Sequence, residues 1–134
     1  MRTLQHLTCL AAFIMGAPCF AASDYFAFIV SSEDGIYRAD FDSATGTLSD
    51  ATLAAEGKGM NFIEVHPNGR VLYAAQRTQG GSGQVAAYAI DGKTGGLTKI
   101  NTVETKHGPA HVNIDATGRV VVTANYGGGS ISVA

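Results

Sequence analysis

The chain has 134 residues, with nine Lys or Arg against eleven Asp or Glu, and its formal net charge is −2. Hydrophobic residues make up 46% of it and charged residues 15%, which is typical of a folded globular protein and not of a disordered segment. This balance provides no basic surface for nucleic acid, so we expect no nucleic-acid partner.

The first predicted element is a secretory signal peptide over residues 1–22. Arg2 precedes a short apolar stretch over residues 7–15, and small residues follow it up to Ala22. The apolar stretch is well below the roughly 20 residues that a membrane-spanning helix needs. We therefore expect a secreted or periplasmic protein with no membrane span after cleavage of this segment.

Both cysteines, Cys9 and Cys19, lie inside the predicted signal peptide. The mature chain would then have no disulfide framework and would depend on burial for its stability. Pro18 disfavours lipidation of Cys19, because the residue directly before a lipidated cysteine must be small. The folded domain is expected to occupy residues 23–134.

From residue 25 onward the chain is predicted to be all-β. Short runs rich in Val, Ile, Tyr, Phe and Thr alternate with turns that contain Gly, Asn and Asp, and no run has a helical period. The predicted strands cover residues 25–30, 36–41, 48–55, 61–66, 70–76, 84–90, 97–104, 110–115, 119–125 and 130 onward.

These elements repeat at a spacing of 49 residues. Residues 41–48 return as residues 90–97, and residues 65–70 return as residues 114–119. Four antiparallel strands in a repeat of this length predict one blade of a β-propeller. We name the strands of a blade A to D, from the central channel outward.

The chain is expected to form an incomplete arc of roughly two to three blades. The first blade lacks its strand A, and the third stops inside strand C. An open arc leaves an apolar face uncovered at each end. We therefore interpret residues 23–134 as the N-terminal part of a larger ring and expect them to aggregate when expressed alone.

The candidate chemistry lies where the repeats disagree. In this topology the D–A and B–C loops share one side of the ring, and strand A lines the channel beside them. His111 stands where Phe62 stands in the previous repeat, and it is the candidate catalytic residue, as a general acid or base. A histidine hydrogen-bonded to a neighbouring blade is the structural alternative.

Three further residues on these loops are candidate substrate-binding residues. His107 aligns with Lys58, so a possible cation recurs at this loop position. Asn125 and Tyr126 end a strand B before three glycines, which let backbone amides approach a ligand. A solvated loop residue is the alternative for His107, and a tight turn is the alternative for Asn125 and Tyr126.

No cofactor motif and no metal site are predicted. The glycines after Tyr126 are not a phosphate-binding P-loop, because no Lys follows them and the next element is a strand. The scattered histidines lack the spacing of metal ligands. His66 aligns with Asp115 before a hairpin turn, and both are expected to accept turn hydrogen bonds.

Residues 125–133, Asn-Tyr-Gly-Gly-Gly-Ser-Ile-Ser-Val, carry a family resemblance together with Gly-Pro-Ala-His-Val at residues 108–112 and the hairpin at residues 115–119. In these motifs the chain resembles the seven-bladed propeller lactonases, of the 6-phosphogluconolactonase and carboxymuconate cyclase type. The resemblance implies a full protein of about 340 residues. It also implies that most catalytic residues lie in later blades; Ala110 stands where the family's Gly-Pro-Arg-His motif has its Arg.

Together with the predicted signal peptide, the resemblance implies an exported lactonase-like protein that hydrolyses or forms a lactone ring, with a small-molecule lactone or sugar acid as its partner. A phosphorylated sugar is not expected outside the cytoplasm, which disfavours 6-phosphogluconolactone itself. The alternative is a non-catalytic periplasmic or surface propeller that presents its loops to a protein or polysaccharide. The lactonase is the leading hypothesis, and later repeats that lack the family's catalytic motifs would favour the alternative.

Overall fold

The computed structural model describes residues 25–134, so the predicted signal peptide lies outside the described residues. The elements are β1 (Tyr25–Ser31), β2 (Gly35–Asp42), β3 (Thr47–Leu48), β4 (Thr52–Glu56), β5 (Met60–Val65), β6 (Val71–Arg77), η1 (Gln79–Gly81), β7 (Gly83–Ile90), β8 (Leu97–Thr105), β9 (His111–Ile114), β10 (Val121–Asn125), η2 (Tyr126–Gly128) and β11 (Ser130–Val133). None of the helices among these residues is long and apolar enough to cross a membrane.

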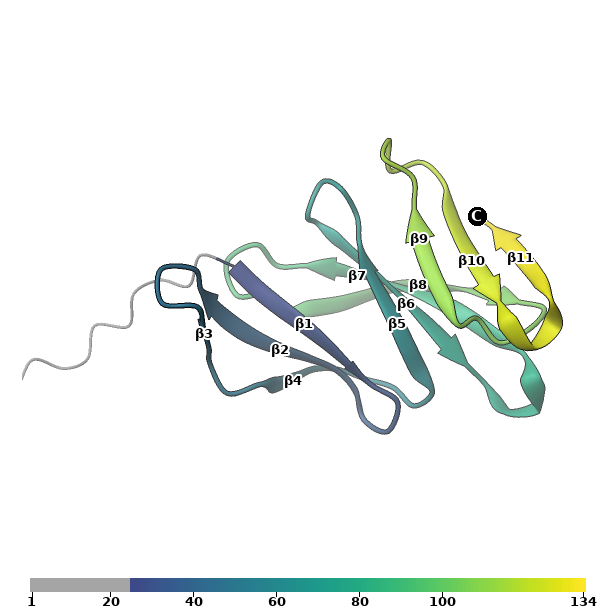
Figure 1. Ribbon diagram of the computed structural model, residues 1–134, viewed down its shortest axis with the longest axis horizontal. Coiled ribbons are helices and arrows are strands. Elements are labelled where there is room, and N and C mark those ends of the chain that lie inside the picture. Colours follow the sequence, from purple (N-terminus) through teal and green to yellow (C-terminus); the bar gives the residue numbers. More distant parts are fainter. Residues whose placement is uncertain (1–24) are drawn as a thin grey trace, which may run out of the picture.

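The strands form three antiparallel sheets that fan out next to one another (Figure 1). The middle sheet has the order β5-β6-β7-β8, which is a complete four-stranded blade. The sheet before it contains β1 to β4, the sheet after it has the order β11-β10-β9, and β5 contacts both β1 and β9. The prediction of an arc of propeller blades is confirmed.

Strand D of the first blade differs from the prediction of one strand over residues 48–55. It is divided into β3 and β4, which both pair with β2. The physical reason lies at Ser49, whose Oγ accepts a hydrogen bond of 2.9 Å from the Asp40 N–H. A side-chain oxygen takes the place of a backbone carbonyl there, so the regular ladder is interrupted between the two short strands.

The middle blade is buried on both of its faces. Successive side chains of a strand point to opposite faces, and the neighbours Ala74 and Ala75 on β6 belong to two different apolar clusters. Ala74 packs with Ile36 of the first blade, and Ala75 packs with Val112 of the third. Small side chains on β6 therefore let both neighbouring blades approach it closely.

The first and last strands of the described arc carry exposed apolar side chains. Tyr25 on β1 is 63% exposed, and Ile131 on β11 is 71% exposed. A groove of about 100 Å³ also lies between the second and third blades, with Val103, Val121 and Val133 in its wall. Apolar surface is therefore exposed both on β1 and β11 and in the groove between two blades.

The turns between strands lie on two opposite sides. We call the side of the β2–β3, β5–β6, β7–β8 and β9–β10 turns the hairpin face, and the side of the β4–β5, β6–β7, β8–β9 and β10–β11 connections the loop face. In Figure 1 the β5–β6 and β9–β10 turns lie at the top, and the β6–β7 and β10–β11 loops lie at the lower right.

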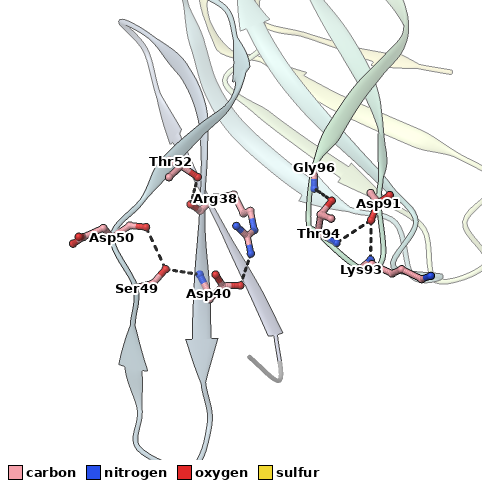
Figure 2. A network of polar contacts seen from close by, with 9 residues as sticks. All are labelled: Arg38, Asp40, Ser49, Asp50, Thr52, Asp91, Lys93, Thr94 and Gly96. Carbon is pink, nitrogen blue, oxygen red and sulfur yellow. Dashed lines mark hydrogen bonds and ion pairs between the residues drawn. The ribbon is translucent and has the colours of Figure 1, made fainter. Parts of the chain in front are cut away.

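The hairpin face is held by side chains that accept hydrogen bonds from turn backbone. Asp91 Oδ1 accepts from Thr94 N at 2.8 Å and from Lys93 N at 2.9 Å, and these bonds lower the pKa of Asp91 (Figure 2). Asp42 Oδ1 accepts from Ala44 N and Thr45 N one repeat earlier. The repeated sequence thus encodes the same capped turn twice.

Arg38 on β2 connects this face of the first blade to the second. Its guanidinium is paired with Asp40 (Figure 2). It also lies 4.8 Å from the centre of the Phe26 ring. Gly95 of the β7–β8 turn lies against it, since a Cβ there would be 2.7 Å from Arg38 Nε. The Arg38 side chain therefore fills the seam between two blades.

His66 and Asp115 hold the β5–β6 and β9–β10 turns, and their predicted structural role is confirmed. Asn68 N donates to His66 Nδ1 at 3.0 Å. The ring proton is therefore on Nε2, which donates to Gly118 O of the next blade at 3.1 Å. Asp115 Oδ1 accepts from Arg119 N at 2.7 Å and from Val120 N at 2.8 Å. One position thus stabilises its turn with two different side chains.

Candidate functional site

A hollow of about 170 Å³ opens on the loop face, between the second and third blades. Its wall combines three connections that are distant in sequence, as the topology predicts. It is lined by Arg77, Thr78, Gly81 and Ser82 at the β6–β7 loop, by Gly108 of the β8–β9 loop, and by Tyr126 and Gly127 at the β10–β11 loop. All of its walls belong to described residues.

Backbone hydrogen bonds hold the β6–β7 loop in the shape that forms this hollow. Thr78 N donates to Ser82 O at 3.0 Å, and Gly108 N of the next blade donates to Gly81 O at 2.8 Å. Gly80 and Gly81 have φ angles of 83° and 85°, which side-chain-bearing residues rarely adopt. Successive glycines are therefore required for the loop to reach the neighbouring blade.

Among residues 25–134, Arg77 is the only charged residue in the wall of the hollow. Its stem lies against Gly108, where a Cβ would be 3.0 Å from Arg77 Cγ. Within residues 25–134 no ion pair or side-chain hydrogen bond involves its guanidinium. Sequence reasoning did not single out this residue, although the repeat could have found it: Arg77 stands 49 positions before Tyr126.

Tyr126 is the predicted site residue that the structure places in this hollow. Its side chain is 84% exposed, at the start of η2. The phenol can therefore donate a hydrogen bond to a ligand without giving up one in the protein. Arg77 and Tyr126, one repeat apart, face the same space from two adjacent blades.

Asn125 precedes Tyr126, but its side chain lies inside the third blade. It is 1% exposed, and its Nδ2 donates to Ser132 Oγ at 2.9 Å while its Oδ1 accepts from Thr123 Oγ1 at 3.1 Å. These bonds fix the end of β10 and the start of β11. The substrate contact predicted for Asn125 stays a prediction, and the contacts support a role in positioning the loop that carries Tyr126.

His107 lies on the β8–β9 loop and is not among the residues that line the hollow. Its imidazole fills the space beside Gly128, where any Cβ would collide with the ring. Thr105 Oγ1 donates to the His107 carbonyl at 2.9 Å. The ring thus holds the β10–β11 loop in place, and its predicted contact with substrate stays a prediction.

His111 is exposed at the start of β9, and it does not line the hollow. Its ring lies on Phe62, with 4.0 Å between ring centres. The two aligned residues of successive repeats are therefore in contact across the seam. No hydrogen bond within residues 25–134 involves the His111 ring nitrogens, so both are available to a ligand or a water.

Asn61, next to Phe62, provides a polar group that sequence reasoning missed. It is the bulge residue of β5, because the register shifts between Met60 and Phe62. Its Nδ2 donates to Pro109 O at 2.9 Å, and its buried Oδ1 has no partner within the described part of the chain. Bulges often redirect a side chain near a functional site, and a buried acceptor of this kind calls for a partner.

No group of three or more His, Cys, Asp or Glu side chains within residues 25–134 could hold a metal ion. The groups available for chemistry on the loop face are an imidazole at the inner strands and a guanidinium, hydroxyls and a phenol in the hollow. This combination suits the binding and hydrolysis of a small oxygen-rich molecule.

The sequence profile described as "Lactonase, 7-bladed beta-propeller" matches residues 23–134. A 6-phosphogluconolactonase of Bacillus subtilis is 35% identical over 101 residues, which are 75% of this chain and 29% of that protein. A 6-phosphogluconolactonase of Formosa agariphila is 33% identical over 103 residues, which are 73% of this chain and 28% of that protein.

The solved structure of a periplasmic gluconolactonase from Pseudomonas aeruginosa also resembles this chain. Its TM-score is 0.67 at 27% sequence identity, and the match covers 77% of this chain and 31% of that one. The chain therefore spans about 30% of the length of the relatives that it matches.

Proposed function

This chain belongs to the seven-bladed β-propeller lactonase family, and from this premise we propose that the full-length protein hydrolyses the lactone of a sugar acid. Water adds to the lactone carbonyl, the ring C–O bond breaks, and the ring oxygen leaves as a hydroxyl group. The observation that carries the proposal is the profile match over residues 23–134, supported by relatives that are 6-phosphogluconolactonases and a gluconolactonase.

In this proposal His111 acts on the water or on the leaving oxygen. A neutral imidazole can accept a proton from the attacking water, and an imidazolium can donate one to the leaving group. Its exposed ring, backed by Phe62 and with both nitrogens available, supports this role. The remaining groups that act on the carbonyl would come from parts of the protein outside residues 25–134.

We also propose that the protein is exported. The basic and apolar segments of residues 1–22 support this, as does the resemblance to a periplasmic gluconolactonase. Fractionation of the native organism, followed by N-terminal sequencing of the mature protein, tests it. Recovery of an intact Met1 in the cytoplasmic fraction would contradict export.

The activity test uses the full-length protein with glucono-δ-lactone and its 6-phosphate. Proton release is followed at constant pH against the spontaneous rate and against heat-denatured protein. We expect hydrolysis of at least one lactone well above both controls. If neither lactone is hydrolysed faster than in buffer, the lactonase proposal is wrong, and a binding propeller remains as the alternative.

A further inference from the structure

We propose that the hollow on the loop face is an anion subsite, in which Arg77 binds a carboxylate or a phosphate monoester of the ligand. This inference rests on the proposed function in one respect: it takes the anion to be part of a lactone or a sugar acid. The hollow itself is defined by residues of the second and third blades.

The chemical groups of the wall favour an anion. They comprise one guanidinium, two hydroxyls, one phenol and three glycines, and no carboxylate of the described part of the chain lines the hollow. A guanidinium presents a planar set of N–H donors that matches two oxygens of a carboxylate or phosphate. Arg77 has no competing anion within residues 25–134, so its charge remains available for a ligand.

The hydroxyl groups add at least one further donor. Thr78 Oγ1 and Ser82 Oγ are 2.8 Å apart, so one of them donates to the other. Each hydroxyl carries a single hydrogen, and the acceptor of that bond keeps its own hydrogen free. The exposed phenol of Tyr126, on the adjacent third blade, is another free donor.

The subsite is arranged before any ligand binds. The stem of Arg77 lies against Gly108, and Gly108 N donates to Gly81 O at 2.8 Å, so the stem and the β6–β7 loop both contact the same residue of the next blade. A loop that is held in this way loses less conformational freedom on binding than a mobile one. The volume of about 170 Å³ far exceeds the ~10–15 Å³ that one water needs.

The test measures binding to the full-length protein with three probes: inorganic phosphate, gluconate and glucose. Phosphate and gluconate distinguish a phosphate subsite from a carboxylate subsite, and glucose is the uncharged control. Calorimetry gives the affinity, and the NMR signal of the Arg77 Nε–H reports contact with the anion. We expect saturable binding of at least one anion, a shift of that signal, and no binding of glucose to the same site.

Arg77→Gln is expected to weaken anion binding at least tenfold, and Arg77→Lys is expected to weaken it less because it keeps the charge. Arg70→Gln is the matched control, since Arg70 is an exposed arginine at the hairpin face and the variant has the same change in charge. Circular dichroism verifies that each variant is folded. Equal affinity of the Arg77→Gln and Arg70→Gln proteins would overturn the inference.

Lactone turnover separates this inference from the proposed function. In the Arg77→Gln variant, the preference in kcat/KM for an anionic over a neutral lactone is expected to fall at least tenfold. An equal loss for both lactones contradicts an anion subsite. A protein that hydrolyses no lactone but loses phosphate or gluconate binding through Arg77→Gln supports the subsite and refutes the lactonase proposal.

Discussion

The two sides of the arc use the same repeat in opposite ways. On the hairpin face, successive blades keep the same physical solution: Asp42 and Asp91 cap corresponding turns, and His66 and Asp115 accept corresponding backbone hydrogen bonds, from Asn68 N and Thr117 N. On the loop face, the aligned residues have different chemistry, with Phe62 against His111 and Arg77 against Tyr126. On the hairpin face, the turn backbone requires a hydrogen-bond acceptor at the same positions in each repeat. The loop face has no such requirement at the aligned positions, so its side chains can differ.

This contrast explains why the polar groups differ in their partners. The Asp115 carboxylate is engaged by the backbone of its own turn. The His111 ring and the Arg77 guanidinium make no hydrogen bond within the described residues. Polar groups without a partner are available for a ligand. Variants on the loop face should therefore change ligand binding or lactone turnover, and variants on the hairpin face should change the free energy of unfolding.

The largest expected effect comes from exchanging one histidine on each face. In the full-length protein, His111→Ala is expected to lower lactone turnover at least tenfold with a nearly unchanged thermal midpoint, because it removes an acid or base that makes no hydrogen bond in the fold. His66→Ala is expected to lower the thermal midpoint and keep turnover, because it removes two turn hydrogen bonds. Kinetics and thermal unfolding of both variants measure the contrast. Unaltered turnover of the His111→Ala protein, or its failure to fold, assigns that residue to structure.

The next prediction concerns Asn125, which lies on the loop face although its side chain is buried inside the blade. Asn125→Ala leaves the Thr123 and Ser132 hydroxyls without this partner, so it is expected to lower the free energy of unfolding by about 1–3 kcal/mol. Asn113→Ala, at an exposed asparagine of β9, is the control and should change it by about 0.5 kcal/mol or less. Denaturant unfolding gives both values. Two equally stable variants, with a raised KM only for Asn125→Ala, would instead support the predicted substrate contact.

A pair of glycines tests how the hairpin face connects adjacent blades. Gly69 and Gly118 occupy the same turn position, with φ angles of 69° and 72°. Alanine is strained at both, at a cost of roughly 1–2 kcal/mol, but nothing lies within 4 Å of a Cβ at Gly69, whereas a Cβ at Gly118 would collide with the His66 ring. Gly118→Ala is therefore expected to lower the thermal midpoint more than Gly69→Ala. Equal midpoints would show that the His66 contact is not tight.

The contrast between the faces also shows what could be predicted from sequence. The strands and the capped turns follow from local patterns that occur more than once. One such pattern is an Asp followed by a turn that ends in Thr: Asp42 precedes Ser43-Ala44-Thr45, and Asp91 precedes Gly92-Lys93-Thr94. When a second copy of the repeat has the same pattern, it supports the turn predicted from the first copy. The interruption between β3 and β4 was not predictable, because it depends on one Ser49 side chain replacing a backbone acceptor.

The candidate site was predictable only in outline. The 49-residue alignment identified His111, and Tyr126 was identified as the end of a strand that precedes three glycines. Aligning Tyr126 with the previous repeat would also have identified Arg77. It could not show that the Asn125 side chain points into the blade, because the partners Thr123 and Ser132 depend on the register of β10 and β11. The unpartnered Asn61 oxygen depends on a bulge and a contact between blades, which leave no local signal.

The smallest expected effect is an acid-dependent loss of stability at the hairpin face. Bonds from the Thr117 hydroxyl, then from the backbone N–H of Val120, Arg119 and Thr117, lower the pKa of Asp115 from 3.8 to about 2. Because the folded pKa lies below the unfolded one, the carboxylate stabilises the protein fully above about pH 4 and loses this contribution as the pH falls toward 2. Asp115→Asn is therefore expected to have a lower thermal midpoint than the wild type at pH 7, with a gap that narrows between pH 4 and pH 2. Asp50→Asn, at an exposed carboxylate, is the control with the same change in charge. A gap that stays constant over this range would mean that the Asp115 turn is held by hydrogen-bond geometry alone and not by the negative charge.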